Sequence, residues 1–378
     1  MKRFLYILMA LAAAASCVYP YDAALEPREE PALVLDGDIV IGGYSSVNVS
    51  YLQNFDGTFP QNRKAPEIQE WWIEDEDGNT IKPSSDNLAD TRSLDPSRGY
   101  RIVMKADGKT IASEFKKTLA PPVIKSVSFR ADEKNVYGYI TIDPSADNTG
   151  YIAINTEEIW HFHAQLIQYF DIQVYDIDGE PMYFVVGAET IPQENYWCWK
   201  KITNDSPLII DISRFEGNNV PEILFTSFPR KNDRNHDEYH IRVSARTLSK
   251  EEYQYYYNLS IEGNVSNDLF SPNPGELSGS VYNVENPSES VFGDISVYQP
   301  AMANGSLNGQ YGVPAGRPDD SFFTKVPAER IPLFYYELNF RPIISLFDDI
   351  GPYVGWAHKR CVDCTLDGGT KEVPEFTY

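Results

Sequence analysis

The chain has 378 residues and a formal net charge of −23, from 55 acidic and 32 basic side chains. So acidic a surface repels nucleic acid and anionic lipid headgroups, and no basic patch marks a nucleic-acid binder, so the sequence excludes that class. The apolar share of 42% is ordinary for a globular protein. A chain of this length is expected to form two domains, each large enough for its own core.

The N-terminal run MKRFLYILMALAAAASC, residues 1–17, has the pattern of a bacterial lipoprotein signal peptide. Its apolar part, about a dozen residues, is too short to span a bilayer as a helix. Cleavage before Cys17 would leave that thiol free to carry lipid, and several acyl chains together anchor a protein firmly. Because Lys2 and Arg3 leave with the signal, the net charge would change from −23 to −25. The alternative is a soluble secreted protein with a cysteine at this place.

The next two segments differ in pattern. Residues 18–31 are Pro-rich and charged, and we interpret them as a tether. Over residues 32–120, short alternating apolar runs separated by turn residues predict an immunoglobulin-like or transthyretin-like β-sandwich. Asp77-Gly78 and Asp107-Gly108 lie between such runs and predict hairpin turns, because Gly adopts positive φ without steric cost. Pro121-Pro122 ends the module, since proline interrupts a strand ladder.

Residues 121–378 are expected to form a larger β-rich C-terminal domain with one short helix. Ser249 followed three residues later by Glu252 is a capping box, and apolar positions at helical spacing come after it. Residues 301–321, rich in Gly, Asn and Pro, predict a long loop. The predicted fold class is therefore mostly β throughout.

Five stretches of this region resemble one protein family, both in their amino-acid sequences and in their order along the chain. They are YIAINTEEIWHFHAQ, YWCW, EYHIRVSARTLSKEEYQYYYNL, LFSPNPGELSGSVYNVENPSESVFGDISV and CVDCTLDGGTKEVPEF. They resemble the Bacteroidetes outer-membrane lipoproteins grouped as a domain of unknown function, DUF4249. Two positions differ from the usual sequence of the family: Ala153 stands where an arginine is usual, and the chain ends in Phe376-Thr377-Tyr378 rather than Phe-Trp.

The resemblance implies a location and a partner. Members of the family are typically outer-membrane lipoproteins encoded beside TonB-dependent receptors, which implies an accessory of nutrient or cofactor uptake that docks on such a receptor. It implies no catalytic residue, no bound cofactor and no particular ligand. Acidic residues after the lipidated cysteine favour surface export in these bacteria, and only Asp22 and Glu26 stand near, so the cell surface and the periplasmic face both stay open.

A structural or adhesive role is the second function that the sequence allows. Fimbrillin-type pilus proteins are also lipoproteins with β-sandwich domains, and they are processed at an arginine ahead of the first strand. Arg28 lies at such a place. A mature chain that starts at Glu29 would favour the pilus role, whereas an acylated Cys17 would favour the tethered accessory.

The histidines and the acidic turns are the candidate metal ligands of the sequence. The histidines His161, His163, His236, His240 and His358, with the Cys361-Val-Asp-Cys364 motif, could form a zinc site, because imidazole and thiolate are the ligands that zinc prefers. Strand alternation gives any two polar residues on one face the same spacing, so a surface role explains the histidines with fewer assumptions. The acidic stretches at 74–79 and 175–180 lack the late Glu of a calcium loop, and hairpin turns explain them better.

The sequence contains none of the common catalytic motifs. Gly279 lies between two serines but lacks the second glycine of a hydrolase nucleophile elbow, and no Walker loop, Rossmann fingerprint or His-Glu-x-x-His is present in the sequence. Paired carboxylates carry no information in a chain with 55 acidic residues. A hydrolase is therefore a minor alternative to a binding protein.

The tryptophans offer candidate contacts. Trp71-Trp72 place adjacent indoles on opposite faces of a strand, so one of them points away from the core of its module unless another domain covers it. Such an indole could contact a ligand or a partner. Trp197 and Trp199 share a face around Cys198 and are expected to belong to a core.

The cysteines that remain after lipidation of Cys17 are Cys198, Cys361 and Cys364. In an oxidising compartment disulfides persist and thiolate metal sites are uncommon. A bond from Cys198 to either of the other two closes a much longer loop than a Cys361–Cys364 bond and so stabilises more, which favours a staple that ties the C-terminal segment to the YWCW strand. The sequence leaves open which of the two sulfurs reaches Cys198.

Overall fold

The computed structural model describes residues 32–51, 65–84, 87–144, 147, 149–204, 206–213, 222–264, 279–311, 323–327, 339–348 and 351–376. The predicted mostly β fold is confirmed, with several antiparallel sheets and, in this part of the chain, one helix longer than a single turn. No helix within the same ranges is long and apolar enough to cross a membrane. Cys17, the tether and Arg28 lie outside the described residues.

The first module is a sandwich of two sheets. One sheet has the order β19-β1-β2-β5, formed by Ile295–Tyr298, Leu33–Val40, Tyr44–Tyr51 and Ala89–Asp90. The other has the order β18-β7-β6-β3-β4, with β8 also paired to β6; its strands are Val281–Asn283, Lys109–Ser113, Gly99–Ala106, Ile68–Asp75, Thr80–Ile81 and Lys116–Lys117. Strands β18 and β19 come from a stretch that the predicted boundary at residue 120 assigned to the C-terminal domain.

The core of the first module follows strand alternation. On β3, Trp71 and Ile73 point inward while Trp72 lies on the opposite face, and β6 contributes Ile102 and Met104 to the same core. The hairpin turns predicted at Asp77-Gly78 and Asp107-Gly108 are confirmed, since each joins two paired strands. The Asp75 carboxylate accepts backbone hydrogen bonds across the first of these turns, and these bonds stabilise the turn.

The second module is a larger sandwich that contains the candidate site. Its first sheet has the order β16-β10-β9, formed by Ile223–Pro229, Asn135–Asp143 and Val123–Ala131. Its second sheet has the order β14-β11-β17-β20, formed by Trp197–Thr203, Tyr151–His163, Glu238–Thr247 and Ala301–Asn308, with β15 (Leu208–Asp211) also paired to β11. Trp160, Phe162, Tyr239 and Ile241 fill the space between the sheets.

The prediction of a loop over residues 301–321 is wrong for its first part, because residues 301–308 form strand β20 along β17. The Gly and Asn residues concealed the alternation of this strand. A Cβ at Gly305 would lie 2.7 Å from Val127 Cγ1 on the facing sheet, so glycine allows close packing here. Residues 312–321 lie outside the described ranges.

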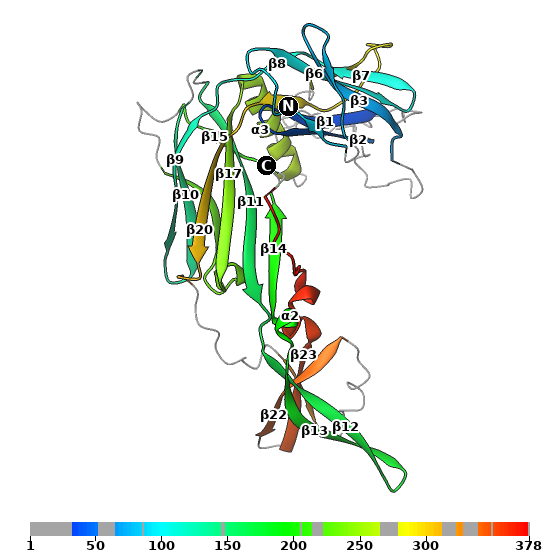
Figure 1. The fold of residues 1–378 in the computed structure, drawn as a ribbon, viewed down its shortest axis with the longest axis vertical. Coiled ribbons are helices and arrows are strands. Elements are labelled where there is room, and N and C mark those ends of the chain that lie inside the picture. The colour runs from blue at the N-terminus through cyan, green and yellow to red at the C-terminus, as the bar shows by residue number, and fades with distance from the viewer. Residues whose placement is uncertain are drawn as a thin grey trace, which may run out of the picture.

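Helix α3, Lys250–Asn264, lies at the junction of the two modules (Figure 1). The predicted capping box is confirmed: the Glu252 amide donates to Ser249 Oγ and the Ser249 amide donates to a Glu252 carboxylate oxygen. Nearby, the buried guanidinium of Arg246 on β17 donates to Tyr256 Oη at 2.7 Å and lies 4.1 Å from the ring centroid of Tyr298 on β19. These contacts connect β17, the helix and the first module.

A third, smaller body lies at the far end of the long axis from the first module (Figure 1). It consists of the hairpin β12–β13, Gln168–Ile177 and Glu180–Thr190, and the sheet β21-β23-β22, formed by Thr324–Pro327, Gly351–His358 and Phe340–Asp348. A separate core of Ile172, Val326, Val354 and Trp356 holds the two together. The short helix α2, Gln193–Tyr196, then leads from the hairpin into β14.

Candidate functional site

The candidate site lies on the outer face of the β14-β11-β17 sheet, opposite the core of the second module. Antiparallel pairing sets His161 opposite Trp199, and His163 opposite Trp197. Alternation along β14 sends Cys198 into the core, where it is 1% exposed, and leaves both tryptophans half-buried on the outer face. The expectation that Trp197 and Trp199 belong to a core is therefore wrong: period two shows which residues share a face but not which face is inside.

Six ring side chains on this face form two stacked groups of three, which meet edge-on where His163 and Trp197 have centroids 5.1 Å apart; together they are here called the ring row. The His161 imidazole stacks on Trp197 and on Trp199, with centroid distances of 4.7 and 4.6 Å. The His163 ring stacks on His236 at 4.1 Å and on Tyr196 at 5.0 Å. The ring row therefore comprises His161, His163, Tyr196, Trp197, Trp199 and His236.

Hydrogen bonds fix the histidines of the row. His161 Nδ1 lies 2.6 Å from Asp237 Oδ2, and His163 Nδ1 donates to the Ala164 carbonyl at 2.7 Å. His236 Nδ1 accepts from the His163 amide at 3.4 Å, so that nitrogen carries no proton. Burial is the largest of the effects that lower the pKa of His236, and the neighbouring His163 and Lys200 lower it further. The carboxylate of Asp233 acts in the opposite direction. The row thus holds a neutral imidazole in a stack of flat rings.

We expect a pH-dependent stability from His236. Its lowered pKa means that the folded chain binds a proton less readily than the unfolded chain does. The resulting stability is present above the ordinary histidine pKa, about 6.5, and is lost as the pH falls through the lowered value. Urea unfolding at pH 7.5, 6.5 and 5.5 should show a smaller loss for His236→Gln than for the wild-type chain. Equal losses would contradict this assignment.

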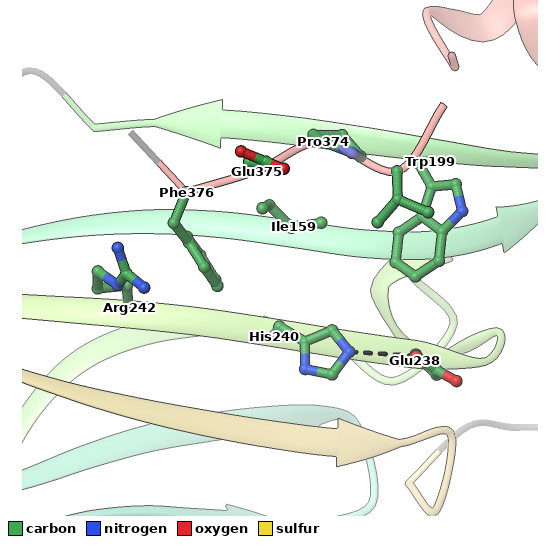
Figure 2. A pocket seen from close by; sticks show the side chains of 9 residues that line it. Ile159, Trp199, Glu238, His240, Arg242, Pro374, Glu375 and Phe376 are labelled. Atoms are coloured by element: carbon green, nitrogen blue, oxygen red, sulfur yellow. Dashed lines mark hydrogen bonds and ion pairs between the residues drawn. The ribbon is translucent and has the colours of Figure 1, made fainter. Parts of the chain in front are cut away.

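A groove with a volume of about 620 Å³ lies beside the ring row, where the C-terminal segment runs along the strands of the sheet (Figure 2). Pro374, Glu375 and Phe376 lie over Ile159, which is 2% exposed. The groove is lined by Ile159, Trp199, Glu238, His240, Arg242, Val373, Pro374, Glu375 and Phe376.

Several contacts hold the C-terminal segment against the sheet. The Arg242 guanidinium lies 4.4 Å from the Phe376 ring centroid, and Lys201 Nζ donates to the Glu375 carbonyl at 2.7 Å. Thr370 exchanges two backbone hydrogen bonds with Trp199, both 2.8 Å long. The segment thereby forms one wall of the groove, whereas the sheet provides its floor.

The disulfide Cys198–Cys364 fastens the start of this segment to β14. The two Cα atoms are 5.8 Å apart and the cysteines are 166 residues apart in sequence. A Cβ at Gly369 would lie 2.5 Å from Cys198 Cβ, so only glycine fits against the bond. Cys361 is a buried free thiol whose pKa is raised by burial. The sequence left the partner of Cys198 open, and the structure places Cys364 there.

Of the other predicted candidates, Trp71, Trp72 and His358 lie apart from this site, whereas His240 lines the groove. Trp71 is 2% exposed in the core of the first module, while Trp72 is half-buried on the opposite face with Lys105 Nζ 5.8 Å from its ring centroid. His240 pairs with Glu238 at 3.2 Å beside the groove, and His358 lies in the third body on β23. Among the residues that the structure describes, no three His, Cys, Asp or Glu side chains converge to hold a metal ion.

A comparison with protein families decides where the chain belongs. The family model described as "Domain of unknown function (DUF4249)" matches residues 18–303. The chain belongs to the DUF4249 family. The match includes the ring row and ends within β20, so the C-terminal wall of the groove lies beyond it. No curated protein matches this DUF4249 member.

Two solved structures show only a faint likeness to this DUF4249 protein. One, from Bacteroides uniformis and titled a "putative carbohydrate binding protein", has 8% identity and a TM-score of 0.16, over 58% of this chain and 92% of that chain. The other, a DUF3823 family protein from Bacteroides ovatus, has 12% identity and a TM-score of 0.13, over 56% and 90%. Scores this low support no inference about fold or ligand.

Proposed function

We propose that this chain is a lipid-anchored binding protein of the outer membrane, which assists a TonB-dependent receptor in nutrient or cofactor uptake. The observation that carries the binding role is the ring row with its adjoining groove. Ligand sites combine an apolar, aromatic surface with a few well-placed polar groups, and their volumes are typically about 300–1,000 Å³. The groove, at about 620 Å³, falls within that range.

The chemistry of the groove suits a ligand that is flat and partly polar. The half-buried indole of Trp199 and the exposed side chain of Val373 offer apolar surface, and an aromatic ring or the apolar face of a sugar can stack on such an indole. Arg242 and the pair Glu238–His240 offer a donor group and an acceptor group at the edge of the groove.

The anchor and the partner rest on the sequence and on the family. The signal pattern before Cys17 supports lipidation. A tether of residues 18–31 could reach at most about 50 Å, which would hold the body close to the membrane. A receptor that spans the same membrane is then within reach, in agreement with the resemblance to lipoproteins encoded beside TonB-dependent receptors.

Mass spectrometry of the mature N-terminus tests the anchor. We expect an acylated Cys17, and the Cys17→Ala chain should leave the outer-membrane fraction. A mature chain that begins at Glu29 would contradict the proposal and favour the pilus role instead.

The groove is tested by native mass spectrometry of the chain purified from outer membranes. We expect a small molecule to be retained by the wild-type chain and to be lost from Trp199→Ala, because the aromatic surface of the groove floor is removed. Trp72→Ala is the matched control, since this half-buried indole lies in the first module, and it should retain the molecule. Equal retention by both variants would contradict the assignment of the groove.

A further inference from the structure

The hairpin β12–β13 exposes an unusual amount of apolar surface. It projects from the end of the third body, farthest from the first module (Figure 1). Large apolar side chains near its turn are between 41% and 50% exposed, namely Val174, Tyr175, Ile177, Met182 and Phe184. Isolated exposed apolar residues are ordinary on a protein surface, but a contiguous group of them marks an interaction site.

The two faces of the hairpin differ in their surroundings. Toward its base, Ile172 is 6% exposed and packs with Val326, Val354 and Trp356 of the third body. The opposite face carries Tyr175, directly across from Met182, and the Tyr175 ring lies edge-on to Phe184 with centroids 5.6 Å apart. We call Tyr175, Ile177, Met182 and Phe184 the outer hairpin face.

The turn at the tip shows that the hairpin is a defined element. Asp178 and Gly179 both have positive φ, 56° and 85°, as the tight two-residue turn requires. The Gly179 amide donates to the Asp176 carboxylate at 2.9 Å. The interpretation of residues 175–180 as a hairpin turn is therefore confirmed, and the exposed apolar side chains stand on a regular, hydrogen-bonded ribbon.

The negative charge of the hairpin indicates what kind of partner can bind to this face. From Asp171 to Phe184 the hairpin carries the carboxylates of Asp171, Asp176, Asp178 and Glu180 and no Lys or Arg. A second copy would bring the same negative charges, and anionic lipid would also be repelled. A protein surface with an apolar centre and a rim of Lys and Arg satisfies both the apolar face and the acidic border.

We propose that the outer hairpin face docks on an apolar, basic-rimmed surface of a protein partner. The inference rests on the proposed function and deepens it, because it assigns the surface through which the TonB-dependent receptor is engaged. The groove of the second module lies on a separate body and stays available for ligand while the hairpin is docked.

The test is quantitative capture of the receptor from solubilised outer membranes. We compare the wild-type chain with Tyr175→Ser/Met182→Ser/Phe184→Ser and with the control Val123→Ser/Leu224→Ser. The control removes two apolar side chains of the second module that are 58% and 46% exposed. All three chains should share one circular dichroism spectrum, because every changed side chain is exposed.

We expect the hairpin variant to capture at least tenfold less receptor, the control to match the wild-type chain, and higher salt to weaken wild-type capture. Equal capture by the hairpin variant overturns the docking assignment and leaves the proposed function intact. A wild-type chain that captures no receptor overturns both. Sedimentation should show wild-type monomers, and a dimer that the hairpin substitutions dissociate would overturn the proposal in favour of a second copy.

Discussion

Cys364→Ala should lower the free energy of unfolding by about 5 kcal/mol on the chain-entropy model, because the bond to Cys198 closes a loop with a separation of 166 residues. Urea or guanidinium unfolding of the chain without its signal peptide measures this loss. The effect should be largest in the transition of the second module, since the bond joins β14 to the C-terminal segment. A multi-module chain can unfold in several steps, so each transition is analysed separately.

Cys361→Ala is the matched control for the disulfide. Cys361 is buried but has no sulfur partner, so its loss should cost only about 1 kcal/mol, as for a small cavity. Reductant should destabilise the wild-type and Cys361→Ala chains and leave Cys364→Ala unchanged. A Cys361→Ala chain that no longer responds to reductant would contradict the pairing, because Cys198 would then be bonded to Cys361.

Trp71→Ala should destabilise the first module by about 3–5 kcal/mol, the usual cost of removing a large buried aromatic side chain. Trp71 is 2% exposed and packs among the inward residues of β3 and β6. Thermal or urea unfolding, followed through a signal of the first module, measures the loss. The second module and the third body should keep their transitions.

Trp72→Ala is the neighbouring control on the same strand. Its indole lies on the outer face beside Lys105, and its removal should cost about 1 kcal/mol, the scale of a partly exposed cation–π contact. Similar losses for the two variants would contradict the assignment of Trp71 to the core. The pair therefore tests which indole of the Trp-Trp sequence points inward.

Local signals in the sequence predicted local structure well. The Asp-Gly pairs predicted hairpin turns because glycine tolerates positive φ, and the Ser249 and Glu252 pair predicted where α3 begins. Alternation predicted a mostly β chain. These features are determined by residues that are close together in the chain, so they can be predicted from a single sequence.

Features that depend on pairing between strands far apart in the chain could not be predicted from the sequence. Strand β19 pairs in parallel with β1, more than 250 residues earlier, and nothing in its composition identifies that neighbour. The composition of residues 301–308 resembles a loop, yet pairing with β17 makes them a strand. The Trp197-Cys198-Trp199 alternation is visible in the sequence, but only the opposite sheet determines that Cys198 faces inward.

The ring row could be predicted in part. Two alternating triplets, His161-Phe-His163 and Trp197-Cys-Trp199, each place two ring side chains on one face of a strand. Their meeting requires the register of β11 against β14, which the sequence does not contain. The C-terminal wall of the groove depends on the Cys198–Cys364 bond. It could not be predicted, because the sequence does not show which cysteine is bonded to Cys198.

Co-purification from solubilised outer membranes tests the central claim most directly. The chain, tagged after Tyr378 and expressed at its natural level in its own organism, is captured in mild detergent, and the recovered proteins are identified by mass spectrometry. The account predicts a TonB-dependent receptor in near-stoichiometric amount with the wild-type chain, and its loss with Cys17→Ala. Recovery of the lipidated chain without any TonB-dependent receptor would contradict the account.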